Sequence, residues 1–229
     1  MRLLALDTAT EACSAALSCD GRVEERFIVA PRRHAELLPG MIDDLLATAG
    51  LSPAGLDLVA FGRGPGSFTG LRIAAGVAQG LAWTRDLPVA PVSDLAALAR
   101  DRLAGRDPGT LCGCAFDARM GQVYWGLFRA GAEGEPAALA PERVCAPEQI
   151  PLPQARLEIA AGSGWQAHGA VLGRRLGGMP PERHPDALPR AAAIAWLGER
   201  MAERGELVAA ERALPVYLRD QVTRPQPDR

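Results

Sequence analysis

The chain has 229 residues, of which 48% are hydrophobic and 23% are charged, and its formal net charge is −2 at pH 7. This length allows one large domain or two small lobes with a sizeable core. The near-neutral charge argues against independent nucleic-acid binding, which leaves a clustered basic surface, so any RNA is expected to be held by a partner.

Residue usage excludes several kinds of chemistry and location. All 25 basic residues are arginine and asparagine is absent, so a Schiff-base lysine, a phosphate-binding lysine and a kinase-type asparagine ligand for magnesium are excluded. The five cysteines have no paired zinc spacing. The chain shows neither a secretory signal pattern nor an apolar run of the ~20 residues that a membrane span needs, so we expect a cytoplasmic protein without membrane contact.

The first half of the chain predicts an α/β lobe. Three strands come first, and the Asp20-Gly21 pair between the second and the third is a strong hairpin signal. Helices then alternate with strands, which is typical of a mixed sheet with flanking helices. Strands are predicted at 2–8, 12–18, 22–29, 56–61 and 87–92, and helices at 32–49, 71–83 and 94–103.

The second half of the chain has shorter and less regular patterns. A linker at 105–109 leads us to predict an N-terminal, partner-binding lobe over 1–104 and a C-terminal lobe over 105–229, with the last helix as a candidate to return to the first lobe. The tail after Arg219 is expected to be disordered. Strands are predicted at 111–116, 121–128, 137–144 and 157–161, helices at 165–176 and 189–204, and loops at 141–153 and 177–189.

The stretch GRGPGSFTG at 62–70 joins a predicted strand to a predicted helix. Its four glycines and one proline mean that the backbone sets its geometry. It is either an anion cradle at a helix N-terminus or a tight connection, and it lacks the Gly-Lys-Ser/Thr ending of a nucleotide P-loop. Asp7, at the end of the first strand, could orient a water, a metal or a phosphate, or could equally hydrogen-bond the following turn. The candidate anion or nucleotide residues are Asp7, Gly64, Gly66, Ser67, Thr69 and Gly70.

The helix after this stretch is expected to be buried against a sheet, with Ser67 as its N-cap. Gly76 and Gly80 are predicted to let another backbone approach it closely. Its apolar residues recur at spacings of three and four, and the predicted buried face contains Phe68, Leu71, Ala74, Ala75, Ala78, Leu81 and Ala82.

The helix predicted at 32–49 carries a double apolar ridge. Burial of each large apolar side chain is worth roughly 1.5–3 kcal/mol, so this ridge must be covered. It either packs on the sheet of its own lobe or contacts a partner helix, since ridges at spacing four serve helix-to-helix packing too. The two columns of the ridge are Leu37, Met41, Leu45, Ala49 and Leu38, Ile42, Leu46.

The sequence contains no recognisable catalytic constellation. The three histidines, His34, His168 and His184, do not have the i, i+4 spacing that places two imidazoles on one helix face around a metal. The candidate carboxylates Asp94 and Asp117 are far from Asp7 in the sequence, and a Gly-x-Ser-x-Gly elbow is absent. We therefore predict no catalytic residue and no metal ligand.

Three stretches together resemble the TsaB family, also called YeaZ, of bacterial threonylcarbamoyladenosine biosynthesis proteins. These are LDTAT at 6–10, RHAELLP at 33–39 and GRGPGSFTGLR at 62–72. Weaker matches are DAR at 117–119 and PVYLR at 215–219. The resemblance covers nearly the whole chain and is strongest over 1–100.

The resemblance implies a two-lobed fold of the actin, Hsp70 and sugar-kinase type, which is RNase H-like. It implies a non-catalytic subunit that binds and activates the enzyme TsaD in the complex that transfers a threonylcarbamoyl group to the adenosine next to the tRNA anticodon. TsaD holds its metal with two histidines, and both are absent from the corresponding stretch at 92–98. ATP and a metal are expected on partner subunits, and no cofactor on this chain.

The resemblance also implies specific partners. The chain is expected to form a heterodimer with TsaD through first-lobe helices, to be joined by TsaE, to form a homodimer when alone, and to meet tRNA only through the complex. The implied partner-binding residues are His34, Leu37, Leu38, Met41, Ile42 and Leu45.

Two other functions compete with this one. An ATP-dependent phosphotransferase of the sugar-kinase superfamily would use Asp7 and the glycine turn around ATP, although the missing lysine and asparagine count against it. A metallopeptidase is the least favoured alternative, because the metal-binding histidines are absent.

Overall fold

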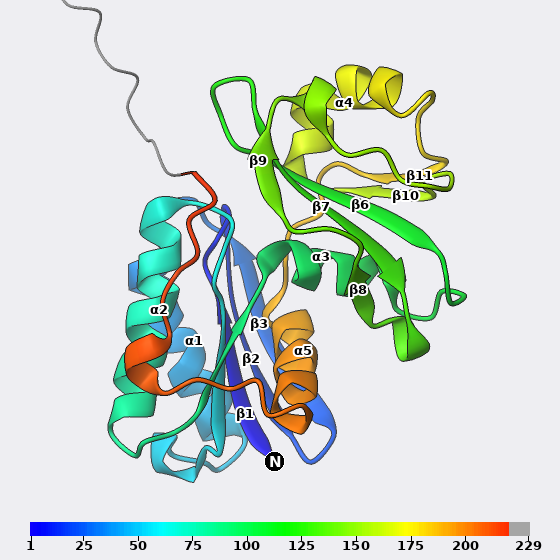
Figure 1. Ribbon diagram of the computed structural model, residues 1–229. Coiled ribbons are helices and arrows are strands. Elements are labelled where there is room, and N and C mark those ends of the chain that lie inside the picture. The colour runs from blue at the N-terminus through cyan, green and yellow to red at the C-terminus, as the bar shows by residue number, and fades with distance from the viewer. Residues whose placement is uncertain (220–229) are drawn as a thin grey trace, which may run out of the picture.

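The computed structural model describes residues 1–219, which form two β-sheets with helices packed on them (Figure 1). The first sheet has five strands in the order β3-β2-β1-β4-β5. The second has six, in the order β11-β10-β6-β7-β8, with β9 paired to β7. The predicted mixed α/β, two-lobed architecture is confirmed.

The first sheet combines an antiparallel meander with two parallel strands. β1, β2 and β3 are antiparallel neighbours, whereas β4 and β5 run parallel to β1. The β2–β3 turn has Asp20 at φ 49° and Gly21 at φ 82°, the left-handed geometry that the Asp-Gly pair predicted. The strands are β1 (Arg2–Asp7), β2 (Ala12–Cys19), β3 (Arg22–Val29), β4 (Leu58–Gly62) and β5 (Val89–Val92).

Helices cover both faces of this sheet, which buries β1 on both sides. Leu4 and Leu6 face α1 (His34–Thr48) and α2 (Phe68–Trp83), and Leu3 and Ala5 face α5 (Ala191–Glu203). This division follows from the two-residue period of a strand. The first sheet is therefore the central layer of a three-layer lobe (Figure 1).

The helix α3 (Asp94–Leu103) lies between the two sheets (Figure 1). Its N-cap is Ser93, because the Ser93 Oγ accepts the Ala96 N–H at 3.1 Å. Ala97 belongs to the core on the α5 side of the first sheet, whereas Leu95 and Leu98 pack against the second sheet. One short helix thus contributes to the cores of both lobes.

The second sheet has α3 on one face and α4 (Ser163–Arg175) on the other. Trp125 on β7 and Trp165 on α4 lie with ring centroids 5.9 Å apart in the core under α4. The strands are β6 (Leu111–Asp117), β7 (Val123–Ala130), β8 (Pro136–Ala138), β9 (Arg143–Cys145), β10 (Ile159–Ala161) and β11 (Glu182–His184).

The prediction was wrong in three places in the second lobe. The strand predicted at 137–144 is two separate strands, β8 and β9, which pair with opposite ends of β7. The loop predicted at 141–153 contains β9, and the loop predicted at 177–189 contains β11, which pairs in parallel with β10. These three-residue strands exist because a neighbouring strand supplies their hydrogen bonds, which local propensity does not reveal.

The segment after α5 returns along the first lobe, beside α2 (Figure 1). Val208 forms a bridge with Val89 on β5, and the Val216 N–H donates to the Arg63 carbonyl at 2.7 Å. Four 3₁₀ turns complete the described residues, and the tail after Arg219, which we expected to be disordered, lies outside them. The turns are η1 (Pro53–Gly55), η2 (Ala132–Gly134), η3 (Pro147–Gln149) and η4 (Ala210–Arg212).

Within residues 1–219, no helix combines the length and the apolar character needed to cross a membrane.

The packing of the α1 ridge can be tested by truncating one residue from each of its two columns. Leu38 is fully buried in the core of the first sheet, whereas Met41 on the same helix is only partly buried. We expect Leu38→Ala to lower the free energy of unfolding by about 2–5 kcal/mol and Met41→Ala to lower it by less than half as much. Urea unfolding of the two variants checks this, and equal losses would contradict the packing described here.

Candidate functional site

Three parallel strands of the first sheet end at the same edge. The register aligns Leu6 with Phe61 and Gly62 with Val92, so Asp7, Gly62 and Val92 lie side by side. The predicted candidates at the end of β1, in the glycine stretch and at the start of α3 therefore meet in one place. We call residues 62–70 the glycine loop.

The glycine loop packs backbone against backbone on the turn after β1. A Cβ on Gly70 would lie 1.9 Å from the Thr8 carbonyl oxygen, and one on Gly66 would lie 2.4 Å from the Ala9 carbonyl oxygen. In addition, the Thr8 Oγ1 donates a hydrogen bond to the Gly70 carbonyl at 2.7 Å. The glycines at 66 and 70 are thus required because a side chain has no room there.

Several N–H groups of the loop are already bonded within the chain. The Ser67 N–H donates to the Ala9 carbonyl at 2.7 Å, and the Gly64 N–H donates to the Asp94 Oδ2 at 2.5 Å. Ser67 is the N-cap of α2, as predicted, through a longer bond of 3.4 Å from the Gly70 N–H to its Oγ. This geometry favours the tight connection over the anion cradle, and the anion or nucleotide site stays a prediction.

Asp7 lies beneath the loop and is completely buried. Its Oδ1 accepts the Ala9 N–H at 2.7 Å, and the Asp7 Oδ1 and the Asp94 Oδ1 both lie next to the Gly62 Cβ position, at 3.1 and 2.2 Å. Burial raises the pKa of Asp7 to about 6, and burial together with the charge of Asp7 raises the pKa of Asp94 well above its usual range. Two acids here disfavour a bound phosphate. The sequence pattern left Asp94 as an isolated residue, although Asp7 ends one strand and Asp94 follows another of the same parallel set.

The implied partner-binding residues on α1 divide into two groups. His34, Leu38, Ile42 and Leu45 are buried within this chain, and the His34 Nε2 lies 3.1 Å from the Ala12 carbonyl oxygen. Their assignment to a contact surface is therefore corrected, because they are core residues of this chain. The periodic apolar pattern of the ridge reflects this burial, which leaves these four side chains inaccessible to a partner. The two remaining residues, Leu37 and Met41, are half-buried at the rim of that core.

α2 carries the neighbouring part of this surface. Gly76 and Gly80, which were predicted to let another backbone approach closely, are exposed, and within residues 1–219 no other backbone packs against them, since a Cβ on either would meet nothing within 4 Å. Ile73 and Val77 beside them are half-buried. We call the surface of Leu37, Gly40, Met41, Ile73, Gly76, Val77 and Gly80 the α1–α2 face.

Phe68 was predicted to be buried but is 51% exposed at the start of α2. Its ring packs against Tyr217 at a centroid distance of 5.2 Å, and the Arg72 guanidinium lies 4.0 Å from the Phe68 centroid. The Arg72 Nε also donates to the Tyr217 hydroxyl at 3.2 Å. These contacts attach the returning C-terminal segment to α2, which the sequence did not indicate.

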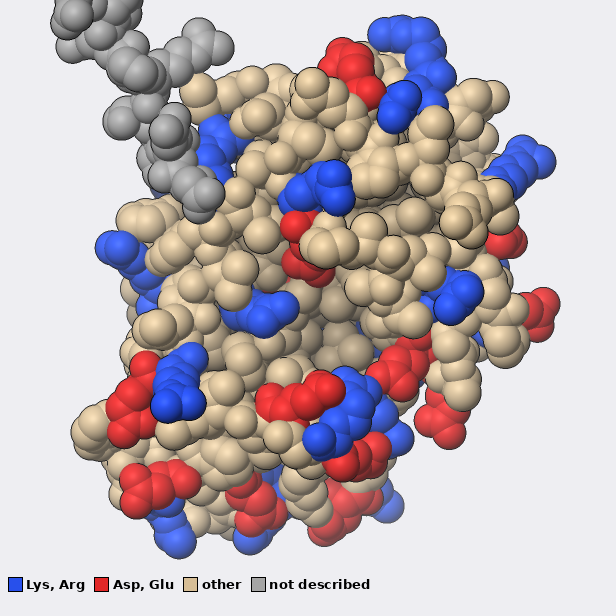
Figure 2. Space-filling view, viewed as in Figure 1, with Lys and Arg blue, Asp and Glu red and all other residues tan. Residues whose placement is uncertain are grey.

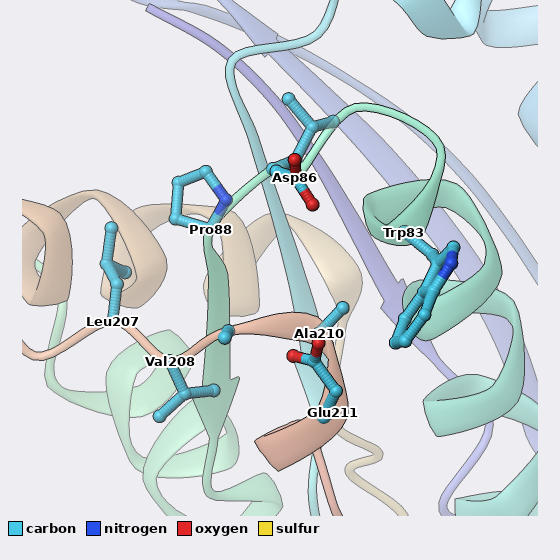
Figure 3. A pocket seen from close by; sticks show the side chains of 9 residues that line it. Trp83, Asp86, Pro88, Leu207, Val208, Ala210 and Glu211 are labelled. Atoms are coloured by element: carbon cyan, nitrogen blue, oxygen red, sulfur yellow. The ribbon is translucent and has the colours of Figure 1, made fainter.

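A pocket of about 350 Å³ lies at the opposite end of α2 from the glycine loop (Figure 3). Trp83, which is 63% exposed, lies on one side of it, with Asp86 and Glu211 nearby. None of the predicted site residues lines this pocket.

The described residues contain no group of three or more side chains placed to hold a metal ion. His168 lies 3.6 Å from an Asp117 oxygen and His184 lies 2.8 Å from a Glu182 oxygen, so each is next to one carboxylate. On the face shown in Figure 2, arginines and acidic residues are interspersed rather than gathered in one basic patch.

Comparisons with known proteins agree with one another. A sequence model of the TsaD family, described as tRNA N6-adenosine threonylcarbamoyltransferase, matches residues 28–223. The tRNA threonylcarbamoyladenosine biosynthesis protein TsaB of Escherichia coli (strain K12) is 41% identical to the chain, covering 97% of this chain and 96% of that protein. TsaB of Haemophilus influenzae is 38% identical, with coverages of 97% and 95%. The solved structure of YeaZ from Pseudomonas aeruginosa is similar with a TM-score of 0.86 and 44% identity, covering 95% of this chain and 99% of that one.

The close packing of the glycine loop can be tested with a pair of glycine substitutions in α2. Gly70→Ala places a Cβ against the Thr8 carbonyl and is expected to lower the free energy of unfolding by about 3 kcal/mol. Gly76→Ala, in open space on the same helix, is expected to raise it by up to about 1 kcal/mol. Denaturant unfolding measures both, and a tolerated Gly70→Ala would show that the contact is not needed.

Proposed function

The chain belongs to the TsaB family of tRNA threonylcarbamoyladenosine biosynthesis proteins, and from this membership we propose that it is a non-catalytic subunit that binds and activates a TsaD enzyme. The membership confirms the family resemblance and the connection with tRNA modification. The observation that supports the finer proposal is the α1–α2 face.

This face has the shape and chemistry of a helix-docking surface. Half-buried Leu37, Met41, Ile73 and Val77 supply apolar area that is incompletely covered by the chain itself. The exposed glycines at 40, 76 and 80 leave the helix backbones open to close approach, since nothing beyond the neighbouring backbone of the same helix lies within 4 Å of their Cβ positions. Two helices of a partner can therefore lie against α1 and α2.

The family match supports a TsaD enzyme as the partner. Because the TsaD sequence model matches most of this chain, a TsaD enzyme shares its fold and has counterparts of α1 and α2. Related chains can pair through equivalent helices about an approximate twofold axis. The same face then supports a homodimer when TsaD is absent.

The proposed role as a non-catalytic subunit also concerns ATP, the metal, TsaE and tRNA. The N–H groups of Gly64 and Ser67 and the carboxyl group of Asp7 are engaged within the chain, which counts against a phosphotransferase built on them. We therefore assign ATP and the metal to partner subunits, with TsaE as a further partner, and place tRNA on the assembled complex in the cytoplasm. No observation favours the peptidase alternative.

Reconstitution tests the proposed role. The purified chain alone is expected neither to hydrolyse ATP nor to modify tRNA, and to restore threonylcarbamoyl transfer when added to TsaD, TsaE and threonylcarbamoyl-adenylate. Robust turnover by the chain alone would overturn the assignment.

The docking face is tested by adding a long side chain to it. Gly76→Arg is expected to abolish copurification with TsaD without loss of stability, because Gly76 is exposed and arginine is the better helix former. Gly169→Arg on α4 is the matched control, since only the Met179 Cε lies near that Cβ position, at 3.9 Å. Pull-down assays and thermal unfolding measure binding and folding separately, and full retention of TsaD by Gly76→Arg would exclude this face.

A further inference from the structure

Two carboxyl groups meet at the junction of the two lobes, in a place that the proposed function does not use. β4 lies between β1 and β5 in the sheet and ends in Gly62, so it contributes no side chain there. The position of a Gly62 Cβ would be 3.1 Å from the Asp7 Oδ1 and 2.2 Å from the Asp94 Oδ1. Asp7 and Asp94, both 0% exposed, thus share the space above Gly62.

The hydrogen bonds around this pair are incomplete if both groups are ionised. Asp7 Oδ1 accepts the Ala9 N–H and Asp94 Oδ2 accepts the Gly64 N–H. The other oxygen of each carboxyl group, Asp7 Oδ2 and Asp94 Oδ1, is buried without a donor. One proton between the two groups would supply that donor and would remove one of two adjacent buried negative charges.

The charged and titratable groups that face the pair do not offer another solution. On the Asp7 side are Glu25 on β3, which opposes its ionisation, and Cys13 on β2, whose pKa is raised to about 11 by burial and by Asp7. On the Asp94 side is Glu142, which is hydrogen-bonded to Ser93 and whose pKa is raised by burial. The positive charge of Arg63 partly offsets this rise in the pKa of Glu142. Glu25 is itself paired with Arg190 at 2.5 Å, and neither arginine donates to the Asp7 Oδ2 or the Asp94 Oδ1.

The pair titrates as a unit, so its two steps of proton loss belong to both carboxyl groups together. Burial raises the pKa of Asp7 to about 6, and burial with the neighbouring charge of Asp7 raises the pKa of Asp94 well above its usual range. The pair therefore keeps its last proton well above the ordinary aspartate range.

The carboxyl pair connects the glycine loop to α3, the helix between the two sheets. Asp94 bonds the loop twice, since its Oδ2 accepts the Gly64 N–H and its own N–H donates to the Gly64 carbonyl at 3.0 Å. Asp94 is also the first residue of α3, which packs in the cores of both lobes. We propose that Asp7 and Asp94 share a single proton that holds the glycine loop against the start of α3, so that loss of this proton loosens the junction between the lobes.

The variant Asp94→Asn tests the shared proton. The asparagine amide can donate to Asp7 and its oxygen can accept the Gly64 N–H, so it reproduces the protonated acid at every pH. An acid whose pKa is higher in the folded state stabilises the fold at low pH, and this stabilisation is lost as the pH rises toward the folded pKa. Above pH 6, we expect the Tm of the parent chain to fall by about 3–5 °C per pH unit until Asp94 is ionised, while that of Asp94→Asn stays level.

Asp101→Asn is the matched control on the same helix. Burial raises the pKa of Asp101 to about 6 as well, but its stabilisation is already lost by that pH. Asp101→Asn is therefore expected to flatten the dependence of Tm on pH only below pH 6. Parallel profiles of the parent chain and Asp94→Asn between pH 6 and 9 would overturn the proposal.

Hydrogen exchange locates the change. The amide exchange rates are first corrected for their intrinsic dependence on pH. In the parent chain, the corrected rates are expected to rise with pH in peptides covering 62–71 and 92–99, but not in α4. In Asp94→Asn, the corrected rates of the same peptides are expected to stay constant. If that variant does not fold, the carboxyl ¹³C shift of Asp94 in the parent chain gives the answer. Titration of Asp94 near the ordinary aspartate pKa of about 3.9 would refute the shared proton.

Discussion

The structure depends on one contact between two stretches of backbone, in which the glycine loop lies on the turn after β1. The Cβ positions of Gly66 and Gly70 fall within 2.4 Å of carbonyl oxygens at Ala9 and Thr8, so the contact admits hydrogen atoms only. It fixes where α2 begins and how close the helix lies to the sheet. The same loop is hydrogen-bonded to Asp94 of the carboxyl pair at the lobe junction and leads directly into α2, which carries one half of the α1–α2 face.

Much of the first lobe could be predicted because its signals are local. The Asp20-Gly21 turn, the Ser67 and Ser93 caps and the alternation of strands and helices are properties of a few adjacent residues. In the second lobe, β8 and β9 were predicted as one strand and β11 was missed. Each is only three residues long and is stabilised by hydrogen bonds to a neighbouring strand. Their pairing is decided by tertiary structure, which a local pattern does not contain.

The site was predictable in location but not in its details. The period of four on α1 correctly indicated a buried ridge, yet it could not distinguish the core of this chain from that of a complex, so Leu38 was assigned to a partner. Asp7 and Asp94 are 87 positions apart in the sequence, and only the strand order β1-β4-β5 brings them together. The available signal was that each follows a strand of the same parallel set, with glycine ending the strand between them.

The packing of α5 has a consequence for how this protein is made. The face of the first sheet opposite α1 and α2 is covered by α5, whose Gly198 places its Cβ position 3.0 Å from the Ala60 Cβ and 3.3 Å from the Leu3 Cδ1. On the ribosome, the β-strands of this lobe emerge long before that helix is translated. Their apolar face must therefore wait, exposed or chaperoned, until the second lobe has been synthesised, and a nascent chain stalled before residue 191 is the species most prone to aggregate.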